Sequence, residues 1–167
     1  MTGPYLQVFI SSKMQRNVLQ AEREAARSAV EGLGIAKPWH WETCGCAAPY
    51  PPMMICLEAV RNSDALVLIL GSDLTGPTRA EHELAVSLGI PDFMFLRQGR
   101  VKSATRDYVQ SHQARCSYMK FKTPQELQTM IESSLRRYLV DGFRNRKANP
   151  PIGTQVPIVG KIPASGI

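Results

Sequence analysis

The chain has 167 residues and a formal net charge of +6, with 44% hydrophobic and 20% charged residues, which is the composition of a folded globular protein. Its length is that of one ordinary domain, which argues against an enzyme with separate cofactor and substrate lobes. No apolar run approaches the ~18 residues needed to span a bilayer, and no signal peptide pattern opens the chain. The sequence therefore predicts one cytoplasmic domain without a membrane segment.

The predicted strands and helices alternate along the chain. Short β-rich or continuous apolar runs predict five strands, over residues 5–10, 35–41, 65–70, 92–96 and 117–121. Apolar residues at helical spacing predict helices over residues 14–32, 54–61, 78–88, 103–113 and 124–139. Residues 44–52 form a Pro-, Ala- and Gly-rich loop. This order predicts a doubly wound α/β domain with a largely parallel sheet.

The C-terminal part has a different composition. Residues 142–167 contain four prolines and four glycines without periodicity, so we expect a domain over residues 1–141 and an extended tail over 142–167. The tail also carries apolar residues, namely Ile152, Val156, Ile158, Val159 and Ile162. They favour docking on a neighbouring surface, with a floppy chain end as the alternative.

The positive charge lies almost entirely in the second half of the chain. Up to Asp92 there are seven Lys/Arg and ten Asp/Glu, and from Phe93 onward thirteen and four. A basic region of this kind suits nucleic acid, an acidic protein surface or a phosphate-bearing ligand. Because no nucleic-acid-binding motif accompanies the charge, a solvated helix face is the favoured interpretation.

The four cysteines give no metal signal. Cys44 and Cys46 form a C-x-C pair, but the spacings to Cys56 and Cys116 match no structural zinc pattern. Reduced thiols in a cytoplasmic protein are the better interpretation, so we expect no metal site.

In a doubly wound sheet, ligands bind beyond the carboxyl ends of the strands. The loops at that edge are predicted over residues 11–13, 41–52, 71–78 and 97–102. They contain no dinucleotide-binding G-x-G-x-x-G, no P-loop and no G-x-S-x-G nucleophile elbow. The sequence therefore argues against those three classes of site.

A carboxylate remains as the candidate catalytic group at this edge. Thr78 and Glu81 have capping-box spacing, which places Thr78 at the helix N-cap and Glu81 in the first turn. There the helix dipole favours the ionised carboxylate, which suits a nucleophile or a group that stabilises a sugar cation. A plain capping role is the alternative, and Glu83 faces a different side of the helix.

Several stretches together resemble a known family. They are Val8-Phe9-Ile10-Ser11-Ser12, the segment 21–25 followed by Gly32-Leu33-Gly34, the segment 57–64 leading into Leu68-Ile69-Leu70-Gly71, and Thr78-x-x-Glu81-x-x-x-Ala85-x-x-x-Gly89-Ile90-Pro91. Over residues 5–97 the chain resembles the TIR-like domains of bacterial defence proteins, which are related to nucleoside 2-deoxyribosyltransferases. The resemblance implies a flavodoxin-like fold. Position 77 is Pro, so the Trp-x-x-x-Glu pattern of many NAD-cleaving TIR domains is not met.

The resemblance also implies a function and a set of residues. It implies cleavage of the nicotinamide N-glycosidic bond of NAD, by hydrolysis or by cyclisation to a nucleotide signal, in anti-phage immunity. NAD is then the substrate, with no separate cofactor. Glu81 is the expected catalytic residue, and the expected substrate-binding residues are Ser11, Ser12, Trp41, Gly71, Ser72, Thr78 and Arg79. Arg97 and Arg100 are further basic residues on loops at the same edge.

Two other functions stay open. One is transfer or hydrolysis of the base of a nucleoside or nucleotide, with Glu81 as the covalent nucleophile. The other is a non-catalytic module that pairs with other TIR-type domains through the loop of residues 44–53. A homo-oligomer, or an assembly with a defence partner, is expected under either enzymatic function.

Overall fold

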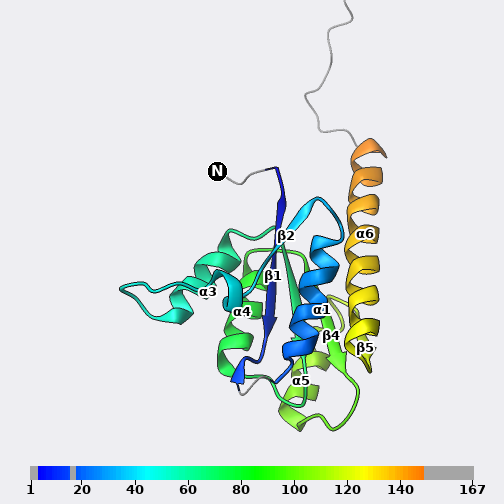
Figure 1. Cartoon of the computed structure of the whole chain (residues 1–167). Helices are drawn as coiled ribbons and strands as arrows, with labels where there is room; N and C mark the ends of the chain where they lie inside the picture. The colour runs from blue at the N-terminus through cyan, green and yellow to red at the C-terminus, as the bar shows by residue number, and fades with distance from the viewer. Residues whose placement is uncertain (1–3, 16–17, 149–167) are drawn as a thin grey trace, which may run out of the picture.

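The computed structural model describes residues 4–15 and 18–148, and it contains one parallel sheet of five strands in the order β2-β1-β3-β4-β5 (Figure 1). The strands are β1 (Leu6–Ser12), β2 (Ala36–Trp39), β3 (Ala65–Leu70), β4 (Asp92–Arg97) and β5 (Tyr118–Phe121). The helices are α1 (Gln20–Glu31), α2 (Trp41–Cys44), α3 (Pro52–Arg61), α4 (Gly76–Ser87), α5 (Ser103–His112) and α6 (Pro124–Ala148). This confirms the predicted flavodoxin-like α/β fold.

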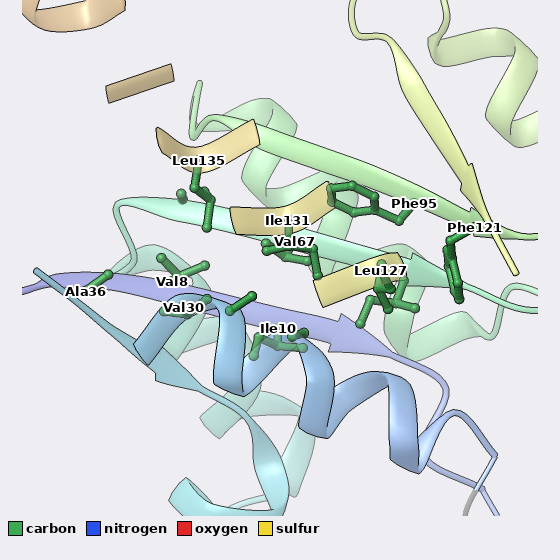
Figure 2. Packing of buried hydrophobic residues seen from close by; sticks show 14 of the residues in the cluster. Val8, Ile10, Val30, Ala36, Val67, Phe95, Phe121, Leu127, Ile131 and Leu135 are labelled. Carbon is green, nitrogen blue, oxygen red and sulfur yellow. The ribbon is translucent and has the colours of Figure 1, made fainter. Parts of the chain in front are cut away.

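Helices cover both faces of the sheet. Side chains of alternating strand residues point to opposite faces, so each strand contributes to two cores. One core lies under α1 and α6 and contains Val8, Val67 and Phe95 from the strands, with Val30 and Ile131 from the helices (Figure 2). The other lies under α3, α4 and α5. It includes Phe9, Leu66, Leu68, Leu70, Met94, Val60, Ala85 and Val109.

The central strand explains why its sequence is a continuous apolar run. All six residues of β3 are buried, because helices cover it on both faces and β1 and β4 flank it. Such a strand has no polar side to expose, which removes the usual alternation. The strand therefore fixes the position of the carboxyl edge, where the sheet order reverses direction between β1 and β3.

Several element boundaries differ from those predicted, and three of them bear on the site or the tail. Helix α1 begins at Gln20, six residues after the predicted start, because Leu19 before it has a left-handed φ of 61° that a helix does not continue. Strand β2 ends at Trp39, and the short helix α2 follows it where the strand end and a loop were expected. Helix α6 continues to Ala148, so residues 142–148 are helical and not part of an extended tail.

The predicted cap of α4 is also wrong. The helix begins at Gly76, with Pro77 in its first turn and Thr75 as the N-cap residue, so Thr78 lies inside the helix. Proline favours the first turn of a helix, where its missing N–H has no partner to lose. Glu81 consequently lies in the second turn, beyond the free backbone N–H groups that a capping residue would reach.

Among the described residues, no helix is both long enough and apolar enough to cross a membrane. Helix α6 has 25 residues, but its last residues before Ala148 are exposed and several are charged. Its upper end extends beyond α1 in Figure 1. The remaining tail prediction, over residues 149–167, lies outside the described residues.

Candidate functional site

A cavity of about 290 Å³ opens at the carboxyl edge of β1 and β2, on the face of the sheet covered by α3 and α4. Four segments that are distant in sequence form its walls: the end of β1, the segment from Trp39 to Trp41, the start of α3 and the start of α4. Its volume is close to the lower limit of ~300 Å³ for small-molecule sites. The cavity thus lies at the predicted edge and holds about one half of a dinucleotide.

Glu81 lines this cavity from α4, and its side chain is almost fully buried, with 8% of the residue exposed. The Ser11 hydroxyl donates a hydrogen bond to Glu81 Oε2 at 2.5 Å. Ser11 reaches it because Ser11 points to the same face of the sheet as Phe9, toward α4. The structure therefore brings together two of the predicted site residues, which lie 70 positions apart in the sequence.

Burial determines the charge state of Glu81. Loss of water raises its pKa from 4.5 to about 7, and hydrogen bonds from Ser11 and Cys56 offset only part of that rise. The expectation that the helix dipole keeps this carboxylate ionised is therefore wrong. A carboxyl with this pKa exists in both forms near neutral pH, which suits proton transfer as well as stabilisation of a cation.

Cys56, which sequence reasoning missed, lies beside this carboxyl. It extends from α3 into the same cavity. Burial raises the pKa of its thiol to about 12, and the neighbouring Glu81 charge adds to the rise. The thiol is therefore neutral at physiological pH, so it acts as a weak hydrogen-bond donor and not as a nucleophile. No signal in the sequence linked Cys56 to Glu81, because helical spacing shows only which residues share one helix.

Two tryptophans form an aromatic wall of the cavity. Trp39 stacks on Phe9 with ring centroids 4.7 Å apart and planes 12° from parallel, so part of its surface belongs to the core. Trp41 begins α2 and is half-buried on the same cavity. A flat ring bound beside Trp41 would gain stacking energy without needing a specific hydrogen bond.

A buried arginine holds α2 against the rest of the site. Arg23 on α1 is 4% exposed and forms an ion pair with Glu42 of α2. Its guanidinium also donates to the carbonyl oxygens of Lys13 and Val18, each at 2.8 Å. Arg23 thereby joins the segment after β1 to the helix that carries Trp41. Arg23 lies in the segment 21–25, one of the stretches that resemble the TIR-like family, but no role was predicted for its side chain.

The remaining predicted residues divide into two groups. Ser12, Trp41 and Thr78 line the cavity, and Thr78 is buried with 3% exposure. Three others do not line it, which corrects their predicted placement: Gly71, Ser72 and Arg79. Gly71 is buried beneath the Leu19 side chain, Ser72 is exposed beside Asp73, and Arg79 pairs with Glu83 on the outer side of α4.

The loop arginines also lie away from this cavity. Arg97 pairs with Glu22 at 3.3 Å, and Arg100 is exposed on the loop after β4. Neither lines the cavity that contains Glu81.

A second polar network flanks Glu81; it is buried at His82 and reaches the surface at Arg115, whose side chain is 41% exposed. His82 is 0% exposed, and its ring nitrogens contact Tyr108 Oη at 2.7 Å and Asp92 Oδ2 at 2.8 Å. Arg115 pairs with the same Asp92 carboxylate at 2.7 Å. Burial alone would raise the pKa of Asp92, but the bonds from His82 and Arg115 hold it far below its ordinary value. This network ties α4 to β4 and α5, and the His82 ring at its centre is buried out of reach of a ligand.

Within residues 4–15 and 18–148, no cluster of three or more His, Cys, Asp or Glu side chains has a geometry that could hold a metal ion. All four cysteines are free thiols. The chemistry available in the cavity is therefore that of one buried carboxyl held by Ser11, the hydroxyls of Ser12, Thr75 and Thr78, one thiol and an aromatic wall.

Comparison with known proteins identifies the family and the fold. A family model described as Domain of unknown function (DUF4062) matches residues 7–136. In sequence, no curated protein matches the chain.

Three solved structures resemble this one at 12–14% identity, which shows a shared fold and nothing further. A conserved protein from Enterococcus faecalis V583 has a TM-score of 0.54, with 78% of this chain and 99% of that chain covered. The flavodiiron core of Flv1 from Synechocystis sp. PCC6803 has a TM-score of 0.52, covering 81% and 37%. The apo form of an NADH:FMN oxidoreductase, EmoB, has a TM-score of 0.51, covering 83% and 90%.

Proposed function

We propose that this chain, which belongs to the DUF4062 family, cleaves the N-glycosidic bond of a nicotinamide nucleotide, with NAD as the substrate. The observation that carries the proposal is the buried Glu81 carboxyl, held by Ser11 at 2.5 Å and facing a cavity with an aromatic wall. The resemblance of residues 5–97 to the TIR-like domains of bacterial defence proteins supports it as well.

The chemistry assigns one role to each part of the cavity. The bond from ribose C1′ to the nicotinamide nitrogen breaks, and its electron pair leaves with the neutral nicotinamide. A water molecule forms the new bond to C1′ and releases a proton, or an adenine nitrogen forms it in a cyclisation. The cation that develops at C1′ is stabilised by the Glu81 carboxylate, and the nicotinamide ring stacks on Trp41.

The raised pKa of Glu81 fits a cationic substrate. An empty cavity favours the neutral acid, because the anion loses its hydration there. The positive charge of bound nicotinamide favours the ionised carboxylate, as any opposite charge within a few ångströms does. Substrate binding and ionisation of Glu81 therefore support each other, and the site favours NAD, whose nicotinamide ring is cationic, over NADH, whose nicotinamide ring is neutral.

The direct test is to incubate the purified protein with NAD and identify the products by mass spectrometry. Nicotinamide with ADP-ribose, or with a cyclic ADP-ribose that is lighter than ADP-ribose by one water, is the expected result. Glu81→Gln should abolish turnover, whereas Glu83→Gln should leave it unchanged, because Glu83 is exposed and paired with Arg79 at 2.9 Å. Equal NAD consumption by Glu81→Gln and the wild type would refute the assignment. Consumption of nucleosides but not NAD would favour base transfer instead.

Assembly is proposed as part of the same function. Tyr50 and Met54 lie next to edge strand β2 and expose 50% and 56% of their surface. Tyr50 belongs to the loop of residues 44–53, which was expected to make contacts, and Met54 follows it. Exposed apolar side chains beside an open sheet edge are common in protein contacts. A second copy of the chain, or a defence partner, is the proposed occupant, and sedimentation of wild type and Met54→Lys tests it. An identical monomer for both proteins would contradict it.

A further inference from the structure

A second cavity lies at the same edge of the sheet, and the proposed reaction does not use it. It has a volume of about 520 Å³ and lies beyond the carboxyl ends of β4 and β5, beside α5. Its floor includes Leu96, Val109 and Tyr118, which belong to the core on that face of the sheet. It shares no lining residue with the cavity that contains Glu81.

The polar lining of this second cavity is entirely basic or neutral. Arg97, Arg106 and Lys120 line it together with two glutamines, and no carboxylate does. Arg97 is partly neutralised by Glu22 at 3.3 Å. In the part of the chain that the structure describes, neither Arg106 nor Lys120 makes an ion pair. Arg106 forms only a long side-chain hydrogen bond, at 3.4 Å to the carbonyl of Val101.

Converging cations without counter-charges repel one another, and a bound anion removes that cost. Arginine and lysine are the side chains that bind phosphate groups most often, through charged hydrogen bonds. Gly99 also lines the cavity, with a φ of 137° that favours glycine. Because glycine has no side chain, a ligand can approach the backbone of this loop closely. The apolar floor with Tyr118 gives a flat ring a surface to rest on.

From this arrangement we infer that the cavity beside α5 is a second site, separate from that of Glu81, which binds a phosphate-bearing small molecule through Arg106 and Lys120. The inference does not depend on the proposed NAD cleavage. It gives a specific use to basic residues of the C-terminal half of the chain.

The second site is mechanically connected to the first. The Lys102 N–H donates to the carbonyl of Ser72 at 2.8 Å, and the Leu74 N–H donates to Thr105 Oγ1 at 2.9 Å. These two bonds fasten the start of α5, which carries Arg106, to the loop that leads into α4. The start of α5 is therefore fixed to the loop that precedes α4 along the chain.

Binding is tested by calorimetry on the full chain with two probes, inorganic pyrophosphate and AMP. Arg106→Gln and Lys120→Gln should each weaken binding by about tenfold or more, as expected for the loss of a charged hydrogen bond. Arg144→Gln, an exposed cation on α6, is the matched control and should bind as the wild type does. The side chains of Arg106 and Lys120 are exposed, so the thermal unfolding temperature of each variant should equal that of the wild type.

The two probes separate the possible sources of the anion. AMP binding more tightly than pyrophosphate supports a nucleotide, and equal or weaker AMP binding supports phosphate alone. Because both tryptophans of the chain line the first cavity, their fluorescence should stay constant while pyrophosphate binds. Binding should also persist in Glu81→Gln, which separates this site from the proposed reaction. Equal affinity of wild type, Arg106→Gln and Lys120→Gln, or no binding of either probe, would overturn the inference.

Discussion

Replacing Glu81 by Gln should change how the stability of the protein depends on pH. In the folded chain burial raises the pKa of Glu81 to about 7, whereas its ordinary value, expected in the unfolded chain, is 4.5. Between these two values the folded state binds more protons than the unfolded state. Its free energy of unfolding must therefore fall as pH rises through this window. Gln has a similar volume and stays neutral at every pH, so the variant lacks this loss.

The magnitude follows from the two pKa values. Each pH unit between them costs about 1.4 kcal/mol, so the wild type should lose about 3 kcal/mol relative to Glu81→Gln between about pH 4 and about pH 8. Glu81 is 8% exposed, so solvent screening reduces this value little. A difference of this size is a large share of the total stability of a small domain.

Urea unfolding of both proteins across that pH range measures the effect directly. Glu83→Gln is the control, because Glu83 is exposed and its substitution should leave the pH dependence of the wild type unchanged. A constant difference between wild type and Glu81→Gln at all pH values would refute the argument that burial controls this carboxyl. A wild type that gains stability relative to the variant as pH rises would refute it more strongly.

Four further outcomes are expected. The kcat/KM of the wild type for NAD should rise as pH increases through about 7, because the ionised form of Glu81 stabilises the cation, and initial rates at NAD concentrations far below saturation measure this. Asp92→Asn should destabilise the protein by about 3 kcal/mol near neutral pH, since it weakens a buried charged network. The wild type should lose stability as pH falls below 3.8, whereas the variant should lose less, because it has no carboxylate to protonate there; urea unfolding checks both results. Arg23→Gln should cost about 3 kcal/mol in urea unfolding and change the fluorescence of Trp41, because α2 loses its anchor. Phe143→Ser should change stability by less than about 0.5 kcal/mol in the same assay, because Phe143 is 73% exposed.

The fold could be predicted because its signals are local. The alternating strands and helices, and the buried run of β3, follow from the hydrophobic pattern alone. The edge that carries Glu81 follows from the fold, since parallel strands end on the same side. The resemblance assigned Ser11 and Glu81 to one site, but the hydrogen bond between them was not predicted, because no spacing rule connects residues so far apart.

The failed predictions each have a physical reason. The capping-box pattern at Thr78 was locally valid, but the preference of Pro77 for the first turn places the start of α4 two residues earlier. Glu81 was expected to be ionised because the helix was considered alone, without the neighbours that remove its water. Gly142 was expected to begin the extended tail, yet α6 continues through it, with open space where a Cβ would lie.

The two serines that end β1 serve opposite layers of the molecule. Ser11 donates to Glu81 on one face of the sheet, and Ser12 accepts a long hydrogen bond from Arg23, which belongs to a helix on the other face. One residue inserted or deleted upstream in β1 would turn each serine to the opposite face of the sheet, although the Ser-Ser sequence itself would be unchanged. The length of this strand is therefore constrained more strictly than most of its side chains. In an alignment of relatives, a gap within residues 6–12 would indicate a different site.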